Sequence, residues 1–513
     1  MLSVKANAVT FFVDRHLDEG RADKSAYLEA ETGRSLSYGE MAQGAAIVAG
    51  ALTQAGIRPE ERAAMLVLDQ IEFPQVFWGA IKAGVVPVPL NTLLGTPVYD
   101  VILRDCRAAI LFVSAPLWEV IAPALTDNPY LRHVVVIGDA AQGGTRYDAF
   151  LKGAAPQATL PVSADEVAFW LYSSGSTGQP KGVAHVHSAL KATADTYGAQ
   201  VLQIAEDDLV LSAAKFFFAY GLGNEMTFPL SVGATSVLFT GRPTPQGMID
   251  TITAHQPTIF CGVPTLYAAM VAHMDKTGAP NVPLRTCISA GEALPEDIGK
   301  RWEAHMGVGI MDGVGSTEML HIFLSNAPGN IVYGTSGIAV PGYELRLVDE
   351  AGAEVGVGEL GELLVNGHSA ATGYWNQRDK SRSTFEGVWT RTGDKYERRA
   401  DGRYIYCGRT DDMFKVSGIW VSPFEVEGAL ISHPQVLEAA VVAAQDENGL
   451  DKPKAFVVLQ SGEANDALLA ELKSHVQTQV GKWKYPRWIE VVEDLPKTAT
   501  GKIQRFKLRS DRT

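Results

Sequence analysis

Residues 172–182 read YSSGSTGQPKG and directly follow the apolar run Val167–Leu171. A short apolar run of this length predicts a buried β-strand, and the segment after it is rich in glycine and hydroxyl side chains. The glycines let backbone N–H groups approach an anion, the Ser and Thr hydroxyls add donors, and Lys181 adds positive charge. We interpret the segment as a polyphosphate-binding loop at the end of a strand.

Two other interpretations of this loop are weaker. A Walker loop requires Gly-Lys-Ser/Thr in direct succession, whereas Gln179 and Pro180 separate Gly178 from Lys181. A flexible Gly/Ser linker is not expected directly after a buried strand. The sequence therefore favours a phosphate-binding loop that is not of the Walker type, which argues against a kinase or a GTPase.

The flanking sequence predicts an α/β fold. Helical patterns alternate with short apolar runs, in the order Tyr38–Ala55, Ala63–Leu68, Phe73–Ala83, Val85–Val88, Ala109–Val113 and Val134–Ile137. This alternation is typical of mostly parallel sheets covered by helices. Short Val-rich runs from about 338 to 408 predict a small β subdomain, and the last hundred or so residues predict a small separate α+β domain. We place the domain boundary between residues 410 and 411.

The composition restricts the class of protein. The chain has 513 residues, 46% hydrophobic and 20% charged, as expected for a folded multidomain protein. Its net charge of −14 argues against nucleic acid and an anionic membrane surface as partners. No stretch approaches the ~20 apolar residues of a membrane span, and the four cysteines show no CxxC pairing. We expect a cytoplasmic protein without disulfides, a zinc site or a signal peptide.

Five further segments follow the loop in order. They are Ser289-Ala290-Gly291-Glu292, DGVGSTE at 312–318, Thr392-Gly393-Asp394, Gly408-Arg409 and PKTATGK at 496–502. Together with the loop, they resemble the adenylate-forming superfamily of acyl-CoA synthetases, luciferases and peptide-synthetase adenylation domains. The resemblance spans about residues 25–507. It implies an enzyme that activates a carboxylic acid with ATP and passes the acyl group to coenzyme A.

The resemblance also implies the nucleotide-binding residues. Asp394 is expected to accept both ribose hydroxyls and Arg409 to donate to the same sugar, although alone they would be a turn residue and a surface ion pair. Val314 stands where the family usually has Tyr, so an aromatic contact to the adenine is either missing or supplied from elsewhere. The residues assigned to ATP and AMP are Ser173, Ser174, Gly175, Ser176, Thr177, Gly178, Lys181, Ala290, Gly291, Glu292, Asp312, Gly313, Ser316, Thr317, Asp394, Arg409 and Lys502.

Lys502, Glu318 and Thr177 are implied to be catalytic. Glu318 offers a hard oxygen ligand for Mg²⁺, whereas a Glu after Ser-Thr is by itself more often a helix cap. Lys502 would place an ammonium between the carboxylate and the α-phosphate. A lone Lys near a C-terminus is usually only solvated, so this role depends on the PKTATGK setting. Acetylation of Lys502 would remove its charge and regulate the enzyme.

Two half-reactions at one site imply a hinge. In the family, the C-terminal domain rotates after the adenylate forms, and the matching position here is Asp411. The rotation would withdraw Lys502 and bring the KVSGIW segment at 415–420 to the site. Gly418 would let the pantetheine arm pass close to the backbone, a simple turn being the alternative. The residues assigned to the hinge and CoA are Asp411, Lys415, Ser417, Gly418 and Trp420.

The acyl pocket is expected around KFFFAYGLGN at 215–224, although an aromatic cluster is more often plain core. With MLHIFLSN at 319–326, it resembles benzoate-CoA ligases of bacteria that degrade aromatic compounds. His321 would line the far end of a ring pocket, or else be a satisfied core histidine. The residues assigned to the acyl pocket are Phe218, Ala219, Tyr220, Gly221, Gly315, His321 and Ile322.

The expected ligands are ATP, Mg²⁺, CoA and a small aromatic acid, with benzoate first. A hydroxybenzoate, an aminobenzoate or cyclohexanecarboxylate stays open, because one hydroxyl or methylene is worth only about 1–3 kcal/mol. A second hypothesis is an adenylating enzyme that loads a carrier protein. A third is a binding protein without catalysis, against which the intact Lys502, Glu318 and Asp394 argue. A homodimer is open alongside a monomer.

Overall fold

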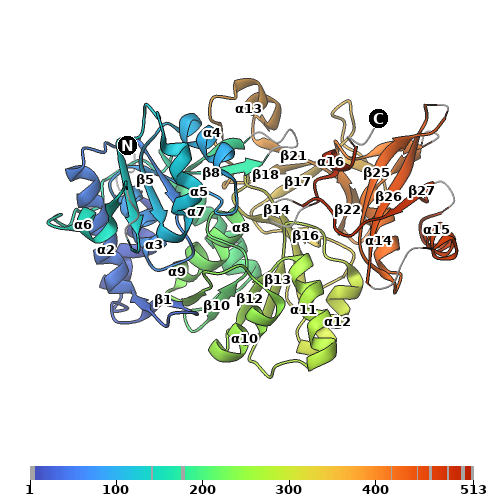
Figure 1. Cartoon of the computed structure of the whole chain (residues 1–513), viewed down its shortest axis with the longest axis horizontal. Helices are drawn as coiled ribbons and strands as arrows, with labels where there is room; N and C mark the ends of the chain where they lie inside the picture. Colours follow the sequence, from blue (N-terminus) through green and yellow to red (C-terminus); the bar gives the residue numbers. More distant parts are fainter. Residues whose placement is uncertain are drawn as a thin grey trace.

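A computed structural model describes residues 6–139, 143–174, 180–416, 419–447, 449–460, 465–481, 484–497 and 503–509. Figure 1 shows the N-terminal elements at one end of the long axis and the last elements of the chain at the other. Several sheets lie between these ends. Among the described residues, no helix combines the length and apolar character needed to cross a bilayer.

The first sheet is parallel throughout and has the strand order β4-β3-β5-β6-β7. Alternate side chains of β3 enter two cores, with Ala63 and Met65 on one face and Ala64 and Leu66 on the other. Helices α2 and α3 cover the first face, and α4 and α5 cover the second. The bounds are α2 Tyr38–Gln54, β3 Arg62–Leu66, α3 Glu72–Lys82, β4 Val86–Pro89, α4 Thr96–Cys106, β5 Ala108–Ser114, α5 Trp118–Ile121, β6 His133–Ile137, β7 Thr145–Arg146 and α6 Tyr147–Leu151.

The second sheet has nine strands in the order β16-β15-β14-β13-β12-β10-β11-β1-β2. Its central strands are parallel, and antiparallel strands close both edges. The strands are β1 Ser25–Glu29, β2 Ser35–Ser37, β10 Leu209–Ser212, β11 Thr235–Leu238, β12 Ile259–Gly262, β13 Thr286–Ser289, β14 Ile310–Gly315, β15 Ile322–Ser325 and β16 Ile338–Ala339. Because parallel strands end at one edge, the segments after β10, β13 and β14 come together there.

Helices cover both faces of this sheet. Helices α10 Pro245–His255, α11 Pro264–Thr277 and α12 Glu296–Met306 pack in one core. The opposite face carries η1 Thr10–Asp14, α1 Arg15–Asp18, α7 His187–Thr193, η4 Ala194–Val201, α8 Ala219–Leu222, η5 Gly223–Thr227 and α9 Phe228–Val232. A three-stranded sheet of β8 Val167–Ser174, β9 Pro180–Val186 and β19 Gly373–Tyr374 lies beside them.

An antiparallel sheet of β17 Glu344–Val348, β18 Leu360–Asn366, β20 Phe385–Glu386, β21 Trp389–Arg398 and β22 Tyr404–Arg409 follows, with α13 Arg378–Thr384 beside it. The last elements have a core of their own that includes Val426, Val441 and Leu472. They are β23 Phe414–Val416, β24 Ile419–Val421, α14 Pro423–Ile431, β25 Val436–Gln445, β26 Asp451–Leu459, α15 Asp466–Val480, β27 Trp488–Val491 and α16 Arg505–Arg509.

The predicted α/β class is confirmed, with helix-covered parallel sheets, a small antiparallel sheet and a small α+β unit at the end of the chain. One detail differs from the expectation for residues 338–408. Ile338–Ala339 pairs with Leu324 and Ser325 at the edge of the nine-stranded sheet. The separate antiparallel sheet therefore begins at Glu344, because the two residues of β16 find their backbone partners in β15.

Candidate active site

Three distant segments meet at Glu318. The Tyr374 hydroxyl donates to Glu318 Oε1 at 2.8 Å, and the N–H of Ala371 donates to the Glu318 carbonyl at 2.8 Å. Lys181 Nζ lies 4.6 Å from the centre of the Tyr374 ring. The pairing of strands β9 and β19 brings Lys181 close to Tyr374, because Tyr374 is the cross-strand partner of Val183, two residues from Lys181. The carboxylate is thus held beside the phosphate-loop lysine.

Positive charge collects around this carboxylate. Burial lowers the pKa of Lys181, Glu318 opposes that effect, and the nearby cations Lys380 and Arg409 lower it further. Lys181 thus has two further cations near it, of which Arg409 is paired with Asp394, so the cations Lys181, Lys380 and Arg409 outnumber the carboxylates Glu318 and Asp394 by one. Such an arrangement suits a polyphosphate carrying Mg²⁺, for which Glu318 offers a hard oxygen ligand.

Asp394 and Arg409 are cross-strand partners on β21 and β22. Arg409 Nη1 donates to Asp394 Oδ1 and to the Thr392 carbonyl, both at 3.0 Å. Burial lowers the pKa of Arg409, but Asp394 and Tyr406 hold it above its ordinary value. The predicted ribose pair is therefore assembled and part-buried, unlike an ordinary surface ion pair.

The predicted adenine segments also lie side by side. Ser289 is the partner of Asp312 across β13 and β14, which sets Ala290 and Gly291 beside Asp312 and Gly313. Burial raises the pKa of Asp312 to about 8, although the N–H groups of Leu294 and Gly313 favour the carboxylate. Asp312 Oδ1 is buried and has no hydrogen-bond partner among the described residues. An unpaired buried acceptor fits an exocyclic amine such as that of adenine.

The predicted acyl residues form an aromatic cluster around His321. Its ring centre lies 5.8 Å from Tyr220, 5.0 Å from Tyr197 and 4.6 Å from Phe228. Burial lowers the pKa of His321 to about 3, so the imidazole is neutral. The backbone of Tyr220 is its polar neighbour and partly offsets the effect of burial, but no hydrogen bond of ordinary geometry to either ring nitrogen forms within the part of the chain that the structure describes. His321 is therefore buried with only a weak polar contact to the Tyr220 backbone.

Close backbone contacts explain the glycines here. A Cβ on Gly221 would lie 2.2 Å from the Lys215 carbonyl oxygen, and one on Gly315 would lie 2.5 Å from that of His321. Ile322 is buried on β15 and packs against Gly313. Ala219 packs against the main core, whereas the ring contact of Phe218 is with Phe217 at 4.3 Å. The structure thus does not bring Phe218 into the His321 cluster.

The hinge and CoA residues lie on one short stretch. Asp411 is in the turn after β22, and its carbonyl accepts from Arg509 Nη1 at 3.2 Å. Lys415 and Trp420 are cross-strand partners, with Lys415 Nζ 4.5 Å from the Trp420 ring centre. The residues Gly175, Ser176, Thr177, Gly178, Ser417, Gly418 and Lys502 and the side chain of Ser174 lie outside the described part.

The remaining assignments are placed as follows. Ser173 lies at the end of β8 with a buried hydroxyl that lacks a described partner. Ser316 caps the backbone by accepting from the N–H of Met319 at 3.2 Å. The Thr317 carbonyl contacts His185 Nε2 at 2.9 Å, and Glu292 follows Gly291 after β13.

Sequence reasoning missed several supporting residues, including Tyr374, His185, Tyr197 and Asn326. Asn326 accepts from Val332 and donates to Thr335, which fixes the segment after β15. Nothing local marks Tyr374, His185 or Tyr197, because each contacts a segment far away in the sequence. For His185 the one available signal is its position three residues after Gly182 on the strand that leaves the phosphate loop.

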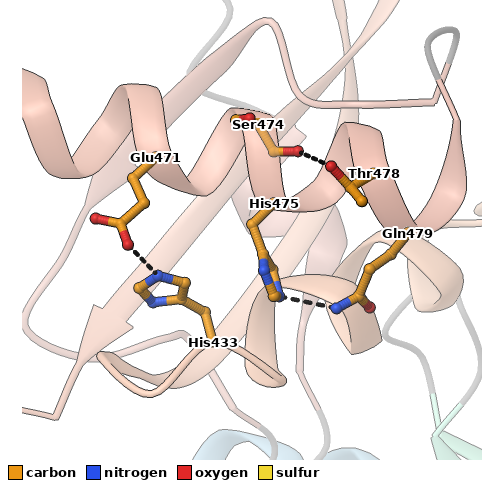
Figure 2. Close-up of a pocket in the computed structure, with 6 residues that line it drawn as sticks. All are labelled: His433, Glu471, Ser474, His475, Thr478 and Gln479. Atoms are coloured by element: carbon orange, nitrogen blue, oxygen red, sulfur yellow. Dashed lines mark hydrogen bonds and ion pairs between the residues drawn. The ribbon is translucent and has the colours of Figure 1, made fainter.

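A separate surface pocket of about 370 Å³ lies between the end of α14 and helix α15 (Figure 2). His433 Nδ1 accepts from the N–H of Gln435 at 3.3 Å, which assigns the proton to Nε2, facing Glu471 at 3.2 Å. Its lining residues are His433, Glu471, Ser474, His475, Thr478 and Gln479. None of these is a predicted site residue, so this pocket is distinct from the candidate active site.

The chain belongs to the AMP-binding enzyme family, whose model matches residues 14–375, and the AMP-binding enzyme C-terminal domain matches residues 425–502. It is 53% identical over 511 residues to the 4-hydroxybenzoate–CoA/benzoate–CoA ligase of Rhodopseudomonas palustris, covering 98% of this chain and 94% of that protein. It is likewise 53% identical to the benzoate–CoA ligase of Thauera aromatica, covering 98% and 96%.

Solved structures agree. A benzoate CoA ligase from Burkholderia xenovorans LB400 superposes with a TM-score of 0.90 at 48% identity, covering 98% of this chain and 99% of that one. The anthranilate CoA ligase AuaEII with anthranoyl-AMP superposes with a TM-score of 0.94 at 42% identity, covering 99% and 98%. The expected superfamily and fold are therefore confirmed.

Proposed function

We propose that the protein is an AMP-forming benzoate–CoA ligase. Benzoate attacks the α-phosphate of ATP to give benzoyl-adenylate and pyrophosphate, and the thiol of CoA then displaces AMP to give benzoyl-CoA. The observation that carries the proposal is 53% identity, over nearly the whole chain, to two relatives named as benzoate–CoA ligases. The proximity of Lys181 to Glu318 and of Asp394 to Arg409 in the candidate site also supports the proposal.

We assign the nucleotide contacts to residues that lie together. Asp394 and Arg409 would hold the ribose, Asp312 the adenine, and Lys181 the polyphosphate. Glu318 would hold Mg²⁺, which when bound offsets phosphate charge and so permits approach of a carboxylate. Lys502, with Thr177 on the phosphate loop, would orient the two anions and balance the charge of the transition state.

The second half-reaction would use another arrangement of the same chain. Residues 1–410 would form the nucleotide-binding domain and residues 411–513 a domain that turns at Asp411. Lys415, Ser417, Gly418 and Trp420 would then face the pantetheine arm. Acetylation of Lys502 would stop adenylation by removing its charge, and a cytoplasmic location agrees with four free cysteines.

The test is product analysis with purified protein. Benzoate-dependent release of AMP and pyrophosphate that turns over only with CoA is expected. Release of ADP, or turnover with a carrier protein but not with free CoA, would contradict the proposal. 4-Hydroxybenzoate is a second candidate substrate, because one relative is named for both acids.

A further inference from the structure

A buried set of charged groups lies next to the predicted acyl residues and takes no part in the roles above. Asp69, in the loop after β3, is 2% exposed, and Glu225, on η5, is 0% exposed. The side chain of Lys215, in the loop after β10, is 13% exposed. Burying ionisable groups is costly unless they are paired, so their retention here calls for a cause.

These side chains hold the backbone that carries the acyl residues. Asp69 Oδ1 accepts from the N–H of Phe216 at 3.3 Å, and Glu225 Oε1 accepts from the N–H of Ser212 at 3.1 Å. Lys215 Nζ lies 3.9 Å from Asp69 Oδ2 and also donates to the Phe239 carbonyl. Phe218 to Gly221 lie between these anchor points in the sequence, so both flanks of the segment are fixed.

The contact from this set to the acyl residues is direct. A Cβ on Gly221 would meet the carbonyl oxygens of Lys215 and Ala214 at 2.2 and 2.4 Å. The turn that bears Lys215 therefore packs against Gly221 without room for another atom. A shift of this turn must move Gly221 and its neighbour Tyr220, whose hydroxyl donates to the Gly262 and Ile288 carbonyls.

The charge states of Asp69 and Glu225 depend on burial and on their neighbour Lys215. Burial raises the pKa of Glu225 well above its ordinary value, and Asp69 is the neighbouring group that raises it most. Burial also raises the pKa of Asp69, but Lys215 and the Phe216 N–H oppose the effect. Lys215 Nζ lies 3.9 Å from Asp69 Oδ2, so of the two carboxyls Asp69 is the one whose negative charge is directly balanced, and a proton is held more readily by Glu225.

Two carboxylate oxygens without hydrogen-bond partners agree with a proton on Glu225. Asp69 Oδ2 and Glu225 Oε2 are both buried without a hydrogen-bond partner among the described residues. A proton on Glu225 turns one of these acceptors into a donor and leaves Asp69 and Lys215 as a neutral pair of opposite charges.

We propose that Asp69, Lys215 and Glu225 form a buried polar unit that positions the Phe218–Gly221 segment and thereby sets the affinity for the aromatic acid. The inference rests on the proposed function. These are positioning residues, because they act on the acid through the backbone of residues 212–221. Glu31, whose carboxylate accepts from Thr240 and Gly241, adds negative charge near both acids.

The experiment compares Asp69→Asn with Glu225→Gln. Asn removes the charge that balances Lys215, so KM for benzoate should rise about tenfold while KM for ATP changes less than about twofold. Gln reproduces the shape and neutrality of a protonated Glu, so KM for benzoate should rise much less. Asp69→Asn with Lys215→Met removes both charges and should recover part of the loss.

Asp208→Asn is the matched control. Asp208 is a buried carboxylate at the opposite end of β10, held by Arg285 and Thr258. Its loss should lower the melting temperature without changing the ratio of the two KM values. The inference fails if Asp69→Asn behaves like this control, or if Glu225→Gln raises KM for benzoate as much as Asp69→Asn.

The Gln variant decides the matter even if Asp69→Asn does not fold. A rise of about tenfold in KM for benzoate in Glu225→Gln would overturn the neutral state of Glu225. Failure of the proposed function looks different, because the unmodified protein would then make no benzoyl-adenylate at all.

Discussion

At the scale of single residues, Tyr374 determines where Glu318 lies. Its hydroxyl donates to the carboxylate at 2.8 Å, and its ring lies beneath Lys181. Tyr374→Phe keeps the ring and removes only this hydrogen bond. A hydrogen bond to a charged group is worth about 1.5–3 kcal/mol, so the Mg²⁺ concentration for half-maximal activity should rise about tenfold. A Mg²⁺ titration at saturating ATP and benzoate measures it.

A second tyrosine supplies the control for that prediction. The Tyr343 hydroxyl shares a hydrogen bond of 2.7 Å with Ser369, whose own hydroxyl donates to the Met319 carbonyl. Tyr343→Phe therefore loosens the same region without touching the Glu318 carboxylate. The rise in melting temperature caused by MgATP should shrink for Tyr374→Phe and not for Tyr343→Phe. Equal effects in both variants would assign Tyr374 a merely structural role.

At the scale of elements, α16 is tied to α14 and to the hinge turn. Arg505 donates to both Glu427 carboxylate oxygens, at 2.7 and 3.0 Å, and Arg509 pairs with Asp412. Lys497 and Ile503, which flank the segment that contains Lys502 in the sequence, form an isolated antiparallel β-bridge. Arg505→Met should therefore slow benzoyl-adenylate formation about tenfold and thioester formation from supplied adenylate less.

Lys454→Met is the comparison for that helix. Lys454 pairs with Glu490 across β26 and β27 at 2.9 Å. Its loss should leave both half-reactions near the unmodified rates. If Arg505→Met slowed the two half-reactions by the same factor, the ion pair between Arg505 and Glu427 would contribute only to the stability of the C-terminal domain.

Elements also show how far sequence reasoning reaches. Helix α2 begins at Tyr38 as expected, because Ser37 and Glu40 form a capping box and the apolar period is regular. The two-residue strand β19 was not predicted, since its pairing with β9 joins residues that are far apart in the chain. Tyr374 belongs to that strand, so local sequence patterns could not predict its contact with Glu318. The ribose pair was predicted only through the family resemblance.

At the scale of the whole molecule, the proposed mechanism requires a different position of Lys502 in each half-reaction. Lys502→Ala should abolish benzoate-dependent exchange of pyrophosphate into ATP, because no other ammonium is assigned between the two anions. Thioester formation from supplied benzoyl-adenylate and CoA should fall far less, since the proposed rotation at Asp411 withdraws Lys502 before the thiol attacks. Both rates are measured on the same preparation.

Lys497→Ala separates the loss of this ammonium from the loss of any lysine in the segment. Lys497 is ion-paired with Glu438 at 2.6 Å and with Asp494 at 3.0 Å, so its charge is already neutralised. Its loss should slow pyrophosphate exchange by less than about threefold, the change expected where no transition-state contact is removed. If Lys502→Ala reduced both half-reactions equally, Lys502 would remain at the site throughout, and the two-position scheme would fall.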